Sequence, residues 1–395
     1  MGKRIVVTVI SDLVTDQRVH KVCRTLHEHG YEVLLIGARR RGSLPLNTRS
    51  YKARRIRVLF QKKVFFYAEF NLRLFFLLLF TPADIFLGND LDVMAATYLA
   101  SKIRRRPVVY DTHEYYMGMP ELNGKPFIKK VWGAIEAWIF PRLRYVYTIC
   151  DSFCELYKKD YGKELKAVRN VPYLDSGAPS PQTHRPDSSP STPESSVLAA
   201  IDSKIPRYKH ILLFQGAGIN PERGVEELVL AMRYLDPVQF HLLIIGGGDI
   251  FDVIKEMVSR EDLGDRITIF PKVPFEVLRH ITRQAHLGLS LDKPTNINHI
   301  YGLPNKIFDY LHSGVPILVS RLVELEKIVN EYQVGTFIEN HEPRYIASCI
   351  REVFDDPERL LQWRKNSERV RRELNWEKES RIVLEIFEQV ELQNS

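Results

Sequence analysis

Residues 302–320 read GLPNKIFDYLHSGVPILVS, and this stretch indicates the fold class most directly. Its first part fits a helix over 304–313, and Pro304 suits the first helical position. Residues 316–320 then form a short apolar run, which is typical of a strand buried on both faces. A helix followed closely by such a strand is a repeating unit of a parallel, doubly wound sheet.

The same alternation extends through both halves of the chain. In the second half, helical patterns separate further apolar runs that predict strands, at 210–214, 241–245, 267–270 and 287–291. In the first half, the predicted strands lie at 4–10, 33–36, 56–60, 84–87 and 108–110. We therefore expect an α/β protein with two Rossmann-like, doubly wound domains that face each other across a cleft.

Composition suggests the domain boundaries. Residues 175–203 are rich in serine and proline and nearly free of large apolar side chains, so they cannot contribute to a core. We place a linker or disordered loop at 173–207, the first domain at 1–172 and the second at 208–373. A last helix follows within 374–395.

The segment 64–80, VFFYAEFNLRLFFLLLF, is the most apolar part of the chain. It contains Glu69, Asn71 and Arg73, and it is shorter than the roughly 20 apolar residues that a membrane-spanning helix needs. We expect a core helix of the first domain. An interfacial helix that touches lipid is the alternative, and it is kept open by nearby basic residues, at Arg54, Arg55, Arg57, Lys62 and Lys63.

Charge is divided unevenly along the chain. Residues 1–170 hold 30 Lys and Arg against 16 Asp and Glu, whereas the remainder holds 26 against 33. A basic first half suggests an anionic partner, either a phosphate-bearing acceptor or an anionic membrane surface, although a solvated basic surface explains it equally well. We expect no nucleic-acid partner, because no zinc finger or RNA-binding strand motif is present.

The cysteines and the opening residues carry little functional information. Cys150 and Cys154 lie four apart, but no second cysteine or histidine pair completes a zinc site, so we expect no metal. The chain opens with MGKRIVVTVISD, which enters a strand pattern without the features of a signal peptide. We therefore expect a cytoplasmic protein, with a peripheral place on the inner face of the membrane as an open alternative.

Polar residues and glycines after the predicted strands are the candidate site, because ligands of open parallel sheets bind beyond the strand carboxyl ends. Gly216 follows the strand at 210–214, and Arg223 follows the next turn, where a guanidinium suits a diphosphate. A surface arginine beside a tight turn is the alternative. The glycines after the next strand, at 246–248, do not match GxGxxG, which disfavours a nicotinamide enzyme.

Lys306 and Asp309 lie three residues apart and should project from the same face of the helix at 304–313. A lysine can neutralise phosphate, and a carboxylate one turn further along can accept two hydrogen bonds from a ribose diol. This spacing matches a nucleoside diphosphate. The alternative is an ordinary surface ion pair, which contributes little.

The first half offers a second set of polar residues. The strand at 108–110 leads into Asp111, Thr112, His113 and Glu114, and a histidine between carboxylates at a strand end suits a functional site. A core histidine with satisfied hydrogen bonds is the alternative. The loop after the first strand would open on the same cleft, with three polar residues, Asp12, Asp16 and Arg18.

Together these segments resemble the GT4-type family of retaining glycosyltransferases, which have the two-domain GT-B architecture. The resemblance spans nearly the whole chain outside the linker. It is carried by DTHEYY at 111–116, RNVP at 169–172, ERGVEELVLAM at 222–232, IIGGGD at 244–249 and LPNKIFDYLHSGVPILVS at 303–320. The family resemblance also implies that the last helix returns to the first domain.

The resemblance implies a role for each candidate residue. Arg223 and Lys306 would hold the donor diphosphate, Asp309 would bind the ribose, and His113 would lie beside the donor sugar at the reacting centre. Further donor-lining residues would be Gly216, Gly246, Gly247, Gly248 and Asn305. Acceptor-side candidates would be Asp12, Asp16, Arg18 and Glu114. The family needs neither a metal nor another cofactor, and the nucleotide sugar is its substrate.

Three departures from the family pattern concern the donor sugar and the loops. Tyr301 stands where the family has the glutamate that contacts the donor sugar, so Asn298 and Tyr301 become tentative donor-sugar contacts, with Asn296 or His299 as substitutes. Ala217 replaces a family arginine, and the first loop lacks the family's glycine pair.

The expected activity is metal-independent, retaining sugar transfer from a nucleotide sugar to a glycan or lipid-linked glycan, as in polysaccharide biosynthesis. Two alternatives remain open: a sugar-nucleotide epimerase on the same fold, or a non-catalytic scaffold that binds nucleotide sugars.

Overall fold

The structure is a computed structural model that describes residues 2–14, 16–46, 48–61, 63–174, 198, 201–206 and 208–394. Most of the segment predicted as a linker, 173–207, lies outside the described residues. The chain divides into two compact units. The first unit comprises Met1–Asn170 and Lys378–Ser395, and the second comprises Val171–Glu377.

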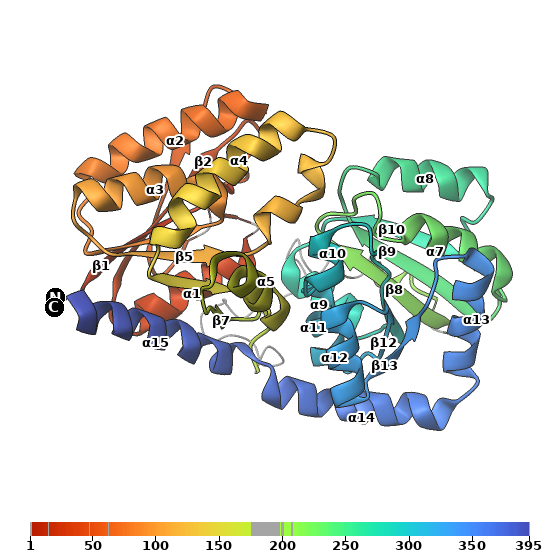
Figure 1. The fold of residues 1–395 in the computed structure, drawn as a ribbon. Helices are drawn as coiled ribbons and strands as arrows, with labels where there is room; N and C mark the ends of the chain where they lie inside the picture. Colours follow the sequence, from red (N-terminus) through yellow and green to blue (C-terminus); the bar gives the residue numbers. More distant parts are fainter. Residues whose placement is uncertain are drawn as a thin grey trace, which may run out of the picture. The chain divides into compact units, whose positions relative to one another are not determined.

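In the described part of the first unit, seven parallel strands form one sheet, in the order β3-β2-β1-β4-β5-β6-β7 (Figure 1). The strands are β1 (Arg4–Thr8), β2 (Glu32–Arg39), β3 (Lys52–Arg57), β4 (Ile85–Asn89), β5 (Val108–Thr112), β6 (Tyr145–Thr148) and β7 (Lys166–Ala167). Val7 in β1 is in register with Leu35 in β2 and Leu87 in β4. The strand order reverses between β1 and β4, which is where a doubly wound sheet opens toward a ligand.

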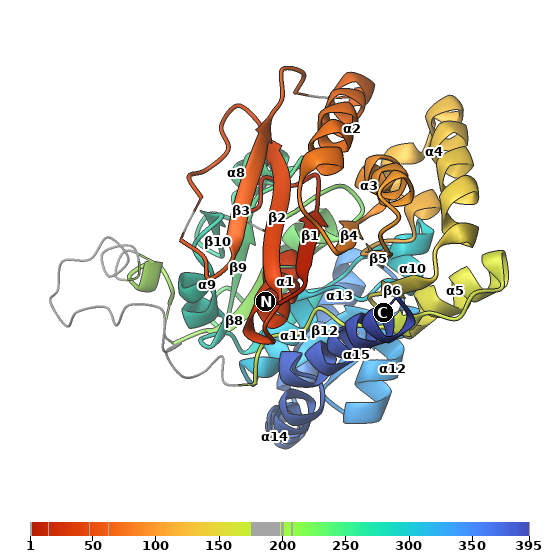
Figure 2. The same cartoon turned by 90° about the vertical axis from the view of Figure 1, so that its left-hand side faces the viewer.

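Helices cover both faces of this sheet. They are α1 (Gln17–Glu28), α2 (Lys63–Phe80), α3 (Leu91–Ile103), α4 (Pro126–Ile139), α5 (Asp151–Tyr161) and the part of α15 (Trp376–Asn394) that starts at Lys378. Figures 1 and 2 show α2, α3 and α4 on one face and α1 and α15 on the other. The return of α15 to this unit is visible in its ion pairs, Lys166 with Glu385 and Arg169 with Glu379.

Two elements of the first unit differ from the sequence interpretation or refine it. The third strand is Lys52–Arg57 instead of 56–60, because β3 is an edge strand that pairs only with β2 and so tolerates lysine and arginine. The apolar segment forms α2 as expected, and every fourth residue of one stripe is buried, at Phe66, Phe70, Leu74 and Leu78. Within the described residues, each helix falls short of the length and apolar character needed to cross a bilayer.

The second unit contains a similar sheet. Across its described residues the strand order is β10-β9-β8-β11-β12-β13, and all pairs are parallel. The strands are β8 (His210–Gly216), β9 (Phe240–Gly246), β10 (Ile267–Pro271), β11 (Leu287–Ser290), β12 (Ile317–Ser320) and β13 (Gly335–Ile338). Here the order reverses between β8 and β11.

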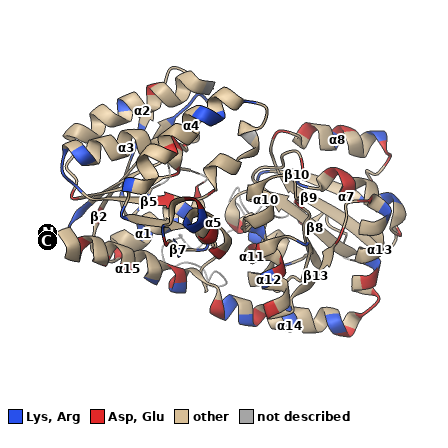
Figure 3. Cartoon of the chain, viewed as in Figure 1, with Lys and Arg blue, Asp and Glu red and all other residues tan. Residues whose placement is uncertain are grey.

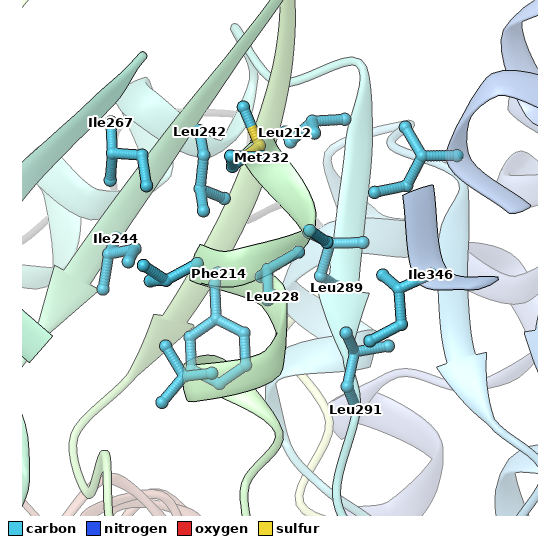
Figure 4. Close-up of a cluster of buried hydrophobic side chains, with 14 of the residues drawn as sticks. Leu212, Phe214, Leu228, Met232, Leu242, Ile244, Ile267, Leu289, Leu291 and Ile346 are labelled. Atoms are coloured by element: carbon cyan, nitrogen blue, oxygen red, sulfur yellow. The ribbon is translucent and has the colours of Figure 1, made fainter. Parts of the chain in front are cut away.

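The helices of the second unit follow its strands in alternation. They are α7 (Val225–Ala231), α8 (Phe251–Arg260), α9 (Phe275–Thr282), α10 (Ile297–Tyr301), α11 (Lys306–His312), α12 (Val323–Tyr332), α13 (Pro343–Phe354) and α14 (Pro357–Glu373). Figure 4 shows strand residues such as Phe214 and Leu289 packed with Leu228 from α7 and Ile346 from α13. The predicted pair of Rossmann-like, doubly wound α/β units is therefore confirmed.

Candidate functional site

A buried carboxylate lies where the strand order of the second sheet reverses. Asp292 follows β11 and is 1% exposed. The Arg223 guanidinium donates to its Oδ2 at 2.8 Å, and the Lys306 ammonium lies 3.9 Å from its Oδ1. We call Arg223, Asp292 and Lys306 the 292 cluster. The sequence interpretation proposed both cations but missed Asp292, although it directly follows a predicted strand.

Local backbone and packing bring the two cations to Asp292. Gly224 adopts a φ of 73°, and a Cβ at this position would overlap the carbonyl of Leu291. Glycine therefore lets the loop that carries Arg223 pass closely against the end of β11. Lys306 is the first residue of α11, and its ammonium lies 4.4 Å from the ring centroid of Phe214.

The cluster carries more positive than negative charge. Burial alone would raise the pKa of Asp292, but Lys306 and Arg223 outweigh it and hold that pKa below its usual value. Burial, followed by Arg223, lowers the pKa of Lys306, and Asp292 opposes this shift. Two cations thus share one carboxylate, whose Oδ1 has no hydrogen-bond partner among the described residues. Such a cluster can accept an anion.

The helix that carries Lys306 is shorter than the sequence suggested. We expected it to begin at Pro304, but α11 begins at Lys306 with Asn305 as its N-cap. The reason is local: the carbonyl of Pro304 accepts a hydrogen bond from the Ile307 N–H in a turn. Asp309 accepts a hydrogen bond from the Gln215 side chain at 3.3 Å, so Lys306 and Asp309 both face the carboxyl end of β8.

A buried tyrosine fixes α11 to the sheet. The Tyr310 hydroxyl donates toward the carbonyls of Leu213 and Leu289 and accepts from the Gln215 N–H. Gly288 in β11 makes room for this ring, because a Cβ there would overlap it. Tyr310 and Gly288 were not identified from the sequence, since a buried tyrosine and a strand glycine have no distinctive local pattern.

The glycines at the ends of β8 and β9 pack against each other. A Cβ at Gly246 would overlap the carbonyl of Gly216, and the carbonyl of Gly247 accepts from the Ile219 N–H at 2.7 Å. Gly246 is buried, whereas Gly248 is exposed. Close contact between two loops thus already explains part of the glycine run, and its role in lining the donor stays a prediction.

The tentative donor-sugar residues lie on or beside α10. Asn298 and Tyr301 are half-buried on this helix, and Asn305 is exposed. The substitutes have structural roles: the Asn296 side chain caps α10 by accepting from the His299 N–H at 2.9 Å, and His299 Nδ1 lies 3.0 Å from the carbonyl of Lys293. The roles of Asn298 and Tyr301 as contacts to the donor sugar stay predictions.

In the first unit, His113 lies between two carboxylates. Its Nδ1 is 3.1 Å from Asp90 and its Nε2 is 3.1 Å from Asp111, which is fully buried and also pairs with Arg18 at 2.7 Å. We call Arg18, Asp90, Asp111 and His113 the 113 cluster. Burial disfavours the imidazolium, but Asp90 and Asp111 outweigh it and raise the pKa of His113 well above its usual value. The two carboxylates thus favour the imidazolium form of His113.

The acceptor-side candidates occupy different environments. The Arg18 side chain is 4% exposed and its guanidinium is bound by Asp111 and by the carbonyl of Val168, so its acceptor-side role stays a prediction. Arg18 lies in the interior because α1 packs against the sheet. Asp16 caps α1 by accepting from the Val19 N–H, and Asp12 accepts from the Val14 N–H. Glu114 is exposed after β5.

Asp90 was missed; it directly follows β4, which extends two residues beyond the strand predicted at 84–87. Its backbone has a φ of 63°, which is unfavourable for a residue other than glycine by about 1–3 kcal/mol. Its carboxylate accepts from the His113 N–H at 2.8 Å and faces the imidazole of the same residue. These contacts compensate for the strain. Nearby, burial and then Asp90 raise the pKa of Asp92 well above its usual value.

Two cavities lie away from these clusters, at the amino ends of the strands. One of about 320 Å³ is bordered by Asp202, Ile211 and His286 in the second unit. Another of about 640 Å³ is bordered by Arg4, Asp84 and Glu391 in the first. Across the described residues, no group of three or more His, Cys, Asp or Glu side chains is placed to hold a metal ion.

Comparison with known proteins gives a family match for each half of the chain. The model of "Glycosyltransferase Family 4" matches residues 16–172, and that of "Glycosyl transferases group 1" matches residues 201–370. The second match contains the whole 292 cluster, and the first contains the whole 113 cluster. A search of curated proteins finds no match to this chain.

Solved structures share the fold over almost the full length. The sucrose-phosphate synthase of Thermosynechococcus elongatus has 15% identity and a TM-score of 0.78, covering 99% of this chain and 100% of its own. A glycosyltransferase from Rickettsia africae has 16% identity and a TM-score of 0.71, with both chains fully covered. Anabaena HepE in complex with UDP-glucose has 12% identity and a TM-score of 0.71, covering 98% of this chain and 100% of its own.

Proposed function

We propose, since this chain belongs to the GT4-type family of glycosyltransferases, that it moves a sugar from a nucleotide-sugar donor to a glycan or lipid-linked glycan in polysaccharide biosynthesis. The observation that carries the donor part of this proposal is the 292 cluster. It combines two cations with one buried carboxylate beside the point where the strand order reverses. A nucleoside diphosphate supplies the negative charge that this cluster lacks.

Each donor group has a matching residue. Arg223 and Lys306 neutralise the diphosphate, and Asp309 accepts hydrogen bonds from the ribose diol. Gly216, the glycines 246–248 and Asn305 line the donor, and Asn298 and Tyr301 contact its sugar. HepE has the same fold and was solved with UDP-glucose, which supports a nucleotide sugar as the donor here. Arg223 keeps 32% of its side chain exposed, so a soluble ligand can reach it.

We infer a retaining reaction that needs no metal. The bond between the anomeric carbon and the diphosphate oxygen breaks, and the acceptor hydroxyl forms a new bond to that carbon on the same face. The hydroxyl proton passes to the departing phosphate oxygen. Arg223 and Lys306 stabilise the charge that develops on the leaving diphosphate, which is the electrostatic role a metal ion has in other transferases.

We infer that the His113 imidazolium lies beside the donor sugar at the reacting centre. Asp90 and Asp111 lie 3.1 Å from its two ring nitrogens, so the two carboxylates favour one orientation of the imidazolium before any ligand binds. Asp12, Asp16 and Glu114 remain candidates for the acceptor side, whereas Arg18 supports Asp111 from within the fold.

The acceptor part of the proposal rests on charge. The first unit contains the basic half of the chain, and a lipid-linked acceptor would bring the enzyme to an anionic membrane surface. We therefore propose a cytoplasmic enzyme that works at the inner face of a membrane without spanning it.

The direct test is a donor screen with intact UDP-, GDP- and ADP-sugars, read by mass spectrometry with and without glycan acceptors. Transfer of the sugar to an acceptor supports the proposal. Conversion of the donor to its epimer without an acceptor would instead identify an epimerase. If a sugar nucleotide raises the thermal unfolding temperature but none reacts, the protein is a non-catalytic scaffold that binds nucleotide sugars, because a ligand of the native state must stabilise it.

A further inference from the structure

Helix α2 has two apolar sides. One side is buried against the sheet of the first unit, through Phe66, Phe70, Leu74 and Leu78. The other side also carries large apolar groups that remain exposed, at Phe65 (67%), Leu72 (60%), Phe76 (54%) and Phe80 (83%). These four residues follow helical spacing, so they form one stripe along the outside of the helix.

The exposed stripe is unusual for a helix on the surface of a soluble unit, because the side away from the core is normally polar. Single exposed apolar residues need no explanation, but a contiguous apolar surface marks an interaction site. The one carboxylate of α2, Glu69, falls within the stripe by helical spacing, but its side chain is only 11% exposed. Glu69 is bound locally by the N–H groups of Leu59 and Phe60 and by the Arg73 guanidinium.

The beginning of α4 adds lysines next to another exposed aromatic ring. Phe127 is 77% exposed, and Lys125, Lys129 and Lys130 around it are exposed as well. Ring contacts connect α4 to the neighbouring helices. The ring centroid of Trp132 lies 5.6 Å from that of Tyr67 in α2, and the ring centroid of Trp138 lies 5.6 Å from that of Tyr98 in α3. The three helices thus form one layer, which Figures 1 and 2 show on the same face of the sheet.

The exposed charged side chains of this layer are basic. The acidic residues of α2, α3 and α4 are Glu69, Asp92 and Glu136, and none of them is exposed. Lys102, Lys129 and Lys130 of the same helices are exposed. Figure 3 shows these helices as largely uncharged ribbon with basic positions and little acidic colour. The layer therefore combines exposed aromatic and aliphatic groups with positive charge.

We propose that this layer is a lipid-binding surface that inserts its aromatic side chains into the boundary of an anionic membrane leaflet. The lipid-binding surface comprises Phe65, Leu72, Phe76, Phe80 and Phe127 together with Lys125, Lys129 and Lys130. This inference assigns a surface to the membrane association proposed above, and it rests on that proposed function. Apolar groups enter the acyl boundary, and the lysines contact anionic headgroups.

A membrane fits this surface better than a second copy of the chain. A twofold contact uses the same patch on both copies, so it would bring two sets of lysines into one interface. An anionic leaflet instead provides opposite charge over the whole surface, and its fluid lipids adapt to a convex helix without a complementary shape.

The test is co-sedimentation of the full chain with vesicles of phosphatidylcholine, with and without phosphatidylglycerol, at low and high salt. We expect the wild-type protein to sediment with the anionic vesicles at low salt and to be released at high salt. The variant Phe65→Ser/Phe76→Ser should bind at least tenfold more weakly. The variant Lys129→Gln/Lys130→Gln should lose about fivefold for each lysine, and only with anionic vesicles.

Matched controls come from the second unit, where Val253 and Leu361 are each 53% exposed and Lys365 is exposed. Val253→Ser/Leu361→Ser and Lys365→Gln should bind vesicles like the wild type. The lipid-binding surface is refuted if the wild type stays in the supernatant, or if Phe65→Ser/Phe76→Ser binds as well as its control. It is also refuted if that variant converts a wild-type dimer to a monomer in light scattering without changing vesicle binding.

The same samples separate this inference from the transferase proposal. Vesicle binding without any turnover of a nucleotide sugar supports the surface and contradicts the transferase. Turnover with a soluble acceptor but no vesicle binding would support the transferase and refute the lipid-binding surface.

Discussion

The two units carry clusters built on the same plan but with different charge. Each has a buried carboxylate near the carboxyl end of a strand, Asp111 within β5 of the first unit and Asp292 after β11 of the second, and each carboxylate contacts two cations. In the 113 cluster, Asp90 adds a second carboxylate, so the charges balance. In the 292 cluster no such carboxylate is among the described contacts, and one positive charge is left over for a ligand.

The arginine of each cluster is also buried to a different extent. The Arg18 side chain is 4% exposed, whereas that of Arg223 is 32% exposed. The 113 cluster therefore supports the fold and orients His113, and the 292 cluster is open to an anion. Similar sets of charged residues can thus serve stability in one unit and binding in the other.

The difference in burial predicts a large difference in stability between two matched variants. Asp111→Asn leaves Arg18 charged in the interior and should lower the free energy of unfolding by about 3–5 kcal/mol. Asp292→Asn should lower it much less, because the Arg223 guanidinium can turn toward water. Urea unfolding of both variants measures this directly. Equal losses would show that the two clusters have the same structural role.

A smaller contrast concerns the glycines that support the two clusters. Gly288→Ala would push a Cβ into the Tyr310 ring and should cost about 1–3 kcal/mol. Gly88→Ala, in β4 of the first unit, would meet the flexible end of Met94 and should cost less. Gly264→Ala is the control, since nothing lies within 4 Å of its added Cβ. Thermal unfolding that ranks Gly88→Ala as the most damaging change would contradict this packing.

The charge of Lys306 should depend on Asp292. Burial and Arg223 lower the pKa of Lys306, and Asp292 raises it, so Asp292→Asn should lower that pKa further. Donor binding needs the ammonium, and it should therefore be lost at lower pH in the variant, with about a tenfold higher KM for the donor on the alkaline side. In the double variant Asp292→Asn/Lys306→Arg this shift should vanish, because the guanidinium stays charged. An unchanged pH profile in Asp292→Asn would refute the coupling.

The smallest effect is expected at Asp90. His113 has a raised pKa in the folded protein, so its ion pairs stabilise the fold fully below pH 6.5, and this contribution is lost as the pH rises through the folded pKa. Asp90→Asn keeps an acceptor for the His113 N–H but removes a charge that raises the His113 pKa, so that pKa should fall. NMR titration of the His113 ring measures this, with His113→Asn to assign the signal. An unchanged titration midpoint of His113 in Asp90→Asn would show that Asp90 does not interact with the His113 ring.

Much of the fold could be predicted because the strands are continuous apolar runs separated by helices. β3 was misplaced because an edge strand carries Lys52, Arg54 and Arg57 and lacks such a run. The length of α11 was overestimated, because whether Pro304 begins a helix depends on a turn that leaves no mark in the sequence.

The candidate site could be predicted only in part. Arg223 and His113 were identified because they follow predicted strands, and Lys306 because it lies three residues before Asp309 on a predicted helix. Asp292 and Asp90 were missed because a single carboxylate gains meaning only when the fold places a cation beside it. The burial of Arg18 could not be predicted either, since nothing in the sequence shows that Asp111 binds it in the interior.

Isothermal titration calorimetry of a nucleoside diphosphate tests the role of the 292 cluster most directly. UDP, GDP and ADP would be titrated into the wild type, Lys306→Ala and the control Lys365→Ala, and thermal unfolding would show that each is folded. We predict that one nucleotide binds the wild type and the control equally, and binds Lys306→Ala at least tenfold more weakly, because a charge-assisted contact to phosphate is lost. Equal affinity in a folded Lys306→Ala would contradict the donor site proposed here.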